Sequence, residues 1–104
     1  MEPLEVSLTD IVLRFDNDTL EAFYTKWEWS LRVPIAWLAV RLEPQKRGFI
    51  FLWIGAGNPP GPVIYGQDVK THGRRLLPLP ATDEPAARAF FAEVASRTGR
   101  TIQP

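Results

Sequence analysis

Residue types that commonly carry catalysis or bind metals are sparse in this chain, and they stand without the partners that such chemistry needs. His72 is the only histidine, and its neighbours Thr71, Gly73 and Arg74 supply neither a carboxylate nor a second imidazole. A general base or a metal ligand depends on such partners. The chain contains no cysteine, which excludes a thiolate nucleophile, a zinc–thiolate site and a disulfide framework. We therefore expect His72 to be a solvated turn residue.

Two further patterns look like binding sites but lack the remaining parts of one. Asp16 and Asp18 are carboxylates two residues apart. A calcium-binding loop would also need a third ligand, then a glycine and a distant glutamate, and these do not follow here. The segment Gly55-Ala56-Gly57 suggests a phosphate-binding loop, but such a loop opens a helix, and here three prolines follow by position 62. We interpret both segments as turns. The sequence predicts no catalytic residue, no metal site and no cofactor.

Two basic clusters are the remaining charged candidates. Lys46 and Arg47 fall in one predicted turn, and Lys70, Arg74 and Arg75 fall near another connection. Ordinary solvated charge explains both clusters. The alternative is a docking patch for an acidic peptide or an anionic membrane, where each basic residue contributes about 1 kcal/mol. Lys70, Arg74 and Arg75 are therefore candidate binding residues, and both interpretations stay open at this point.

The tryptophans are the least ordinary feature, because four are many for a chain of 104 residues. Trp29 alternates in phase with apolar neighbours, so we expect it in the core. Trp37 is out of phase with Leu38 and Val40, so we expect it to face outward together with Arg41. A tryptophan beside an arginine is typical of an interface hot spot. Our hypothesis is that Trp37 and Arg41 lie in a partner surface; the alternative is that each tryptophan belongs to the core.

Apolar residues that recur with a period of two predict about seven β-strands. The first run, residues 5–15, changes phase near Thr9-Asp10, which we attribute to a β-bulge inside one strand. A turn at 16–18 then leads into a strand over 19–25. The other expected strands cover residues 27–33, 37–43, 49–54, 63–65 and 75–79. Residues 55–62 and 67–73 are predicted to be connections, because glycine, proline and polar residues dominate them.

The last part of the chain changes to a helical period. Five apolar residues form one stripe at helical spacing: Ala87, Phe90, Phe91, Val94 and Ala95. Thr82 or Asp83 can cap the start of a helix, and Gly99 suits its end. We predict a helix over about 83–98 that packs against the sheets. The predicted fold is mainly β, a single domain over 1–104 with a partly open barrel or sandwich closed by this helix.

The strand count, the segment Trp29–Pro44 and the helix with Ala89-Phe90-Phe91 together resemble bacterial pleckstrin-homology-like domains, including small actinobacterial proteins of the same layout. This resemblance implies two near-orthogonal antiparallel sheets with one end plugged by the helix. It also implies a binding module. Family members that bind phosphoinositides carry basic residues at the first hairpin, where this chain has Asp16-Asn17-Asp18. Because these carboxylates repel phosphate, we do not expect phosphoinositide binding.

Composition narrows the function further. The 12 basic and 12 acidic residues balance, so the broad positive field typical of nucleic-acid binding is not expected. The longest apolar runs, 33–40 and 49–57, are too short to span a bilayer, and a chain without cysteine fits a reducing, cytoplasmic compartment. We predict a non-enzymatic module that binds a peptide or partner protein, and a homodimer through the same surface is compatible. The alternative is a domain that binds a small ligand or an anionic lipid.

Overall fold

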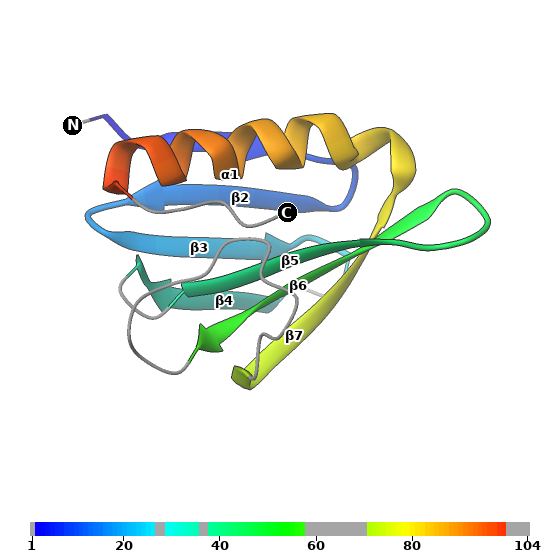
Figure 1. The fold of residues 1–104 in the computed structure, drawn as a ribbon, viewed down its shortest axis with the longest axis horizontal. Helices are drawn as coiled ribbons and strands as arrows, with labels where there is room; N and C mark the ends of the chain where they lie inside the picture. The colour runs from blue at the N-terminus through cyan, green and yellow to red at the C-terminus, as the bar shows by residue number, and fades with distance from the viewer. Residues whose placement is uncertain (1, 27–28, 36–37, 58–70, 100–104) are drawn as a thin grey trace.

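In the part of the chain that the structure describes, seven antiparallel strands form two separate sheets, and one helix follows the last strand (Figure 1). The computed structural model describes residues 2–26, 29–35, 38–57 and 71–99. The first sheet has the order β1-β2-β3-β4 and the second the order β5-β6-β7. The strands are β1 (Leu4–Ser7), β2 (Ile11–Asp16), β3 (Thr19–Tyr24), β4 (Trp29–Pro34), β5 (Leu38–Pro44), β6 (Phe49–Gly57) and β7 (Thr71–Pro80). The predicted mainly-β class with two antiparallel sheets and one C-terminal helix is confirmed.

The N-terminal apolar run is a tight hairpin and not one bulged strand. β1 pairs antiparallel with β2, with Ser7 opposite Val12. The backbone N–H of Leu8 donates to the carbonyl of Ile11 at 2.7 Å, which closes the turn. The predicted β-bulge is therefore wrong. A chain reversal shifts the phase of the apolar residues as a bulge does, so the pattern alone does not separate the two.

The turn between β2 and β3 forms as predicted. Asn17 and Asp18 both adopt left-handed backbone, with φ of 49° and 59°. Two consecutive left-handed residues are typical of the tight turn whose twist matches that of the flanking strands. The inward-facing residues on these two strands are buried: Ile11, Leu13, Phe15, Leu20, Ala22 and Tyr24.

The second sheet is longer than predicted. β6 continues through Gly55 and Gly57, and β7 begins at Thr71, so the predicted loops at 55–57 and 71–73 are wrong. His72 lies opposite Ala56 in this ladder and not in a solvated turn. β6 is paired on both sides, and these ladder hydrogen bonds outweigh the weak strand propensity of glycine. The register shifts between Ile54 and Ala56, as is common near strand glycines. The strand predicted at 63–65 lies outside the described residues.

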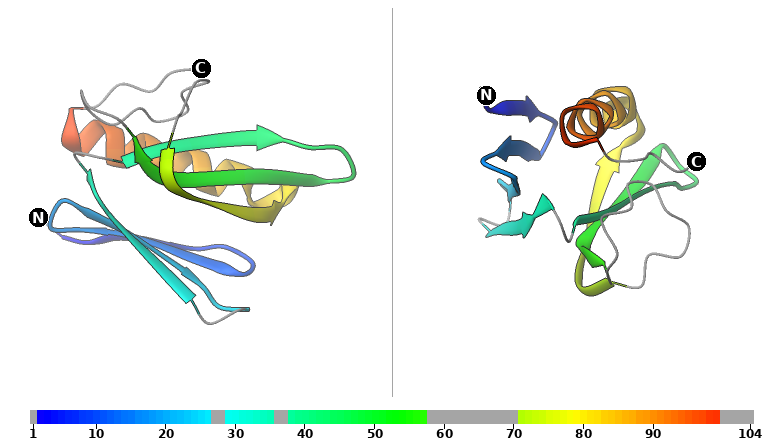
Figure 2. Two further views of the ribbon diagram at one scale, coloured as in Figure 1. Left: turned by 90° about the horizontal axis from the view of Figure 1, so that it is seen from below. Right: turned by 60° about the vertical axis from the view of Figure 1, so that its left-hand side comes forward.

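The helix α1 (Glu84–Thr98) spans the open side between the two sheets, as the right-hand view of Figure 2 shows. All five residues of the predicted stripe are buried, which confirms the helix and its packing face. Gly99 follows with φ of 68° and ends the helix in left-handed backbone. No helix in the described ranges is long and apolar enough to cross a membrane.

The start of α1 is tied to the first hairpin. A short 3₁₀ turn, η2 (Ala81–Asp83), leads into the helix. The Asp83 carboxylate makes no side-chain hydrogen bond to the helix N-terminus. It instead accepts hydrogen bonds from the backbone N–H and the hydroxyl of Thr9, at 3.0 and 3.1 Å. The predicted cap residue therefore joins the helix to the β1–β2 turn.

Candidate interaction surface

The outward face of the second sheet carries a row of aromatic residues. On β6, Ile50, Leu52 and Ile54 point into the core and are at most 1% exposed. The residues between them alternate to the other face, and these are Phe49, Phe51 and Trp53. Phe49 is 49% exposed, more than any other large hydrophobic side chain among the described residues. The Phe51 and Trp53 rings meet edge to face, with centroids 6.5 Å apart.

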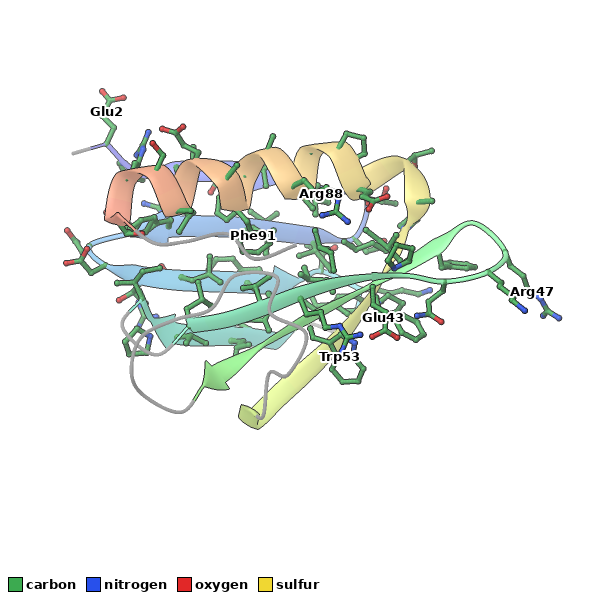
Figure 3. All side chains as sticks on the ribbon, in the orientation of Figure 1. Glu2, Glu43, Arg47, Trp53, Arg88 and Phe91 are labelled. Atoms are coloured by element: carbon green, nitrogen blue, oxygen red, sulfur yellow. The ribbon has the colours of Figure 1, made fainter. Side chains whose placement is uncertain are left out.

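A charged pair on β5 borders this aromatic row. The Arg41 Nη2 atom lies 3.1 Å from the Glu43 Oε2 atom, and the two side chains are 40% and 35% exposed. Arg41 stands opposite Trp53 and Glu43 stands opposite Phe51 in the ladder. Figure 3 shows the Glu43 and Trp53 side chains on the same side of the sheet. We call these five residues, Phe49, Phe51, Trp53, Arg41 and Glu43, the outer aromatic face.

The other border, on β7, is formed by proline. Pro78 stands opposite Phe51 and Pro80 opposite Phe49. The next residue, Ala81, donates its N–H to the Gly48 carbonyl at 2.7 Å, toward the β6 side. N–H groups alternate in direction along a strand, so the positions of Pro78 and Pro80 are those whose N–H would face the free edge. The prolines therefore cost the sheet no hydrogen bond, as predicted for an edge strand.

The outward face of the first sheet is different in character. Ion pairs run across it: Arg14 lies 3.9 Å from Glu5 and 3.4 Å from Asp16. On the neighbouring strands, the Arg32 Nε atom lies 3.2 Å from Glu21. Such half-exposed pairs are typical of a surface that stays in water. Among the described residues, the row of three neighbouring aromatic side chains is thus a property of the second sheet.

The structure places one of the five predicted site residues on this face. Arg41 points outward from β5, as expected. Trp37 and Lys70 lie outside the described residues. Arg74 and Arg75 occupy consecutive positions of β7, with Arg75 opposite Ile54, and their side chains lie outside the described part.

Sequence reasoning missed the three aromatic residues of β6, although a signal was present. Residues 49–54 are apolar at every position, which favours a central strand. A strand that is apolar on both faces needs a covering layer on each side. The described part of the chain offers one helix and one other sheet as covering layers, and both lie on the core side (Figure 2). The aromatic side of 49–54, which no described layer covers, could have been predicted from that imbalance.

A second surface feature is an open groove beside the β2–β3 turn. Its lining residues are Glu2, Phe15, Asp16, Asn17, Asp18 and Arg97. Arg97 is already engaged there, because Nη1 donates to the Glu2 carbonyl at 2.7 Å and Nε to Glu93 at 3.1 Å. Within the described ranges, no three His, Cys, Asp or Glu residues gather in a way that could hold a metal ion. Among the described residues, the groove therefore holds no metal-binding set.

Comparison with protein-family models, with curated proteins and with solved structures finds no match to this chain. The resemblance to pleckstrin-homology-like domains stays a prediction.

Proposed function

We propose that this protein is a non-enzymatic protein-interaction module that binds its partner through the outer aromatic face. The observation that carries the proposal is the row of Phe49, Phe51 and Trp53 on the outward side of a central strand. Aromatic residues and arginine are enriched where proteins bind one another. Arg41 and Glu43 beside the row supply the polar contacts that fix the orientation of a partner.

The described core favours an interaction module over a carrier of a small ligand. A carrier needs an open interior, whereas the described core is filled by apolar side chains from both sheets and the helix.

Binding to an anionic lipid surface is the second candidate, and one observation favours it. Lys46 and Arg47 are exposed at the tip of the β5–β6 hairpin. Figure 3 shows Arg47 extending away from the body of the molecule. Neither residue forms an ion pair with a described residue, and Phe49 lies beside them. At a membrane the pair would contribute about 2 kcal/mol.

A pull-down from the source cell tests the first candidate. Phe51→Ser and Trp53→Ser remove the aromatic contacts, so each is expected to lower recovery of the bound protein at least about tenfold. Phe23→Ser is the matched control, because Phe23 is a half-buried aromatic residue on the first sheet. Its recovery should equal that of the wild type.

The other outcomes of this experiment are also decisive. Equal recovery with all three variants would contradict the outer aromatic face as the binding surface. Recovery of anionic vesicles that is lost with Lys46→Glu/Arg47→Glu, and kept with Trp53→Ser, would establish the second candidate in its place.

A further inference from the structure

The outer aromatic face is complementary to itself, and we infer that its partner is a second copy of this chain. The inference rests on the proposed function and names the partner of the same surface. Its basis is the register of β5 and β6, in which Arg41 is opposite Trp53, Leu42 opposite Leu52, and Glu43 opposite Phe51. Leu42 thus stands midway between Arg41 and Glu43 on β5, and Leu52 stands midway between Phe51 and Trp53 on β6.

A single two-fold axis brings both the charged row and the aromatic row into contact with complementary residues of a second copy. A two-fold axis across the strands, placed outside the face at the level of Leu42 and Leu52, sets Arg41 over Glu43 of the other copy. The same axis sets Phe51 over Trp53 of the other copy. Each contact then occurs twice, as in every isologous dimer. A face with unbalanced charge, or with its charged and aromatic rows out of register, would not match itself in this way.

The axis also gives a regular packing of sheets. It places β6 of one copy antiparallel over β6 of the other, with the two sheets face to face. Face-to-face sheets pack about 10 Å apart with strands within roughly 30° of each other. The Arg41–Glu43 pair of each copy, 3.1 Å apart at present, would become part of a four-residue charge network.

The size of the face predicts the strength of the dimer. Nine residues of β6 extend about 30 Å, and three strands are about 14 Å wide, which gives a contact of about 400 Å² per copy. Stable interfaces bury about 800 Å² per partner. We therefore expect a weak, concentration-dependent dimer, to be measured by sedimentation equilibrium up to about 1 mM protein.

Charge reversal tests the two-fold axis directly. Arg41→Glu places two carboxylates over two carboxylates, and Glu43→Arg places two guanidinium groups over two others. Each variant alone is expected to dimerise at least about tenfold more weakly than the wild type. Mixing the two variants in equal amounts should restore the dimer, because each then meets the opposite charges. The double variant Arg41→Glu/Glu43→Arg should also dimerise by itself.

The controls separate this inference from the proposed function. Arg32→Glu reverses an exposed charge on the other sheet and should leave dimerisation unchanged, and circular dichroism checks that each variant is folded. A wild-type chain that stays monomeric, while Trp53→Ser still loses a captured protein, would overturn the inference and keep the proposed function. A dimer that ignores every change on the outer aromatic face would overturn both.

Discussion

At the scale of single residues, backbone conformation decides which side chains the turns accept. Asn17 and Asp18 hold the β2–β3 turn with positive φ, and Ile35 donates its N–H to the Asp18 carbonyl at 2.7 Å. This backbone hydrogen bond connects the turn to the end of β4. The turn is therefore fixed both by its own backbone conformation and by the hydrogen bond from Ile35. Asn17 and Asp18 each carry a Cβ, so each bears the steric cost of positive φ.

Asp18→Gly is expected to stabilise the fold by about 0.5 kcal/mol, because glycine adopts positive φ without the steric cost that a Cβ brings. Urea unfolding measures the change. Asp10→Gly is the control, since Asp10 is not among the described residues with positive φ. At position 10, glycine only increases the conformational entropy of the unfolded chain, so the free energy of unfolding is expected to fall by about 0.5–1 kcal/mol. A gain in stability at Asp10 as well would refute the argument.

At the scale of elements, the helix is the third layer that completes the core. Phe91 is 0% exposed and packs edge to face on Phe90, with ring centroids 5.2 Å apart. Phe91→Ala removes a buried ring where the sheets cannot collapse, so we expect a loss of about 3–5 kcal/mol. Phe49→Ala makes the same chemical change at a 49% exposed position and should cost less than about 1 kcal/mol. Thermal unfolding of both variants gives the comparison.

The elements were largely predictable from the sequence because their periods are regular. The helical stripe from Ala87 to Ala95 predicted both the helix and its buried face. The first hairpin was not predictable, because the Thr9 turn is held by Asp83, a residue 74 positions away. The extent of β6 was also hidden, since glycine has weak strand propensity and the pairing of Gly55 with Ala39 on β5 and of Gly57 with Thr71 on β7 is not visible in the local pattern. Long-range hydrogen bonds decided the two elements where local pattern failed.

At the scale of the whole molecule, none of the described layers covers the outward side of the second sheet. Only Arg41 of this surface was predicted as a site residue, from its phase in β5. To predict that the aromatic row faces outward, one must know that the other sheet and the helix both lie on the core side (Figure 2). No single strand contains that information.

The free edge of β7 is a second whole-molecule property, set by Pro78 and Pro80. Pro78→Val/Pro80→Val would restore two N–H groups directed away from β6 and raise strand propensity. We expect this variant to form large assemblies on storage, seen by dynamic light scattering and thioflavin fluorescence. Pro85→Val, in the first turn of α1 and away from any sheet edge, is the control and should remain dispersed. A variant that stays dispersed would show that the prolines do not protect this edge.

The position of the two prolines has a consequence for how far self-association can proceed. Growth into a fibre requires a surface on each copy that stays open after the next copy has joined. Strand addition along β7 would be such a process, and Pro78 and Pro80 block it at the C-terminal end of that strand. A face that pairs about a two-fold axis is buried completely in the dimer, so it cannot bind a third copy. Raising the protein concentration should therefore increase the fraction of dimers without forming larger assemblies that precipitate.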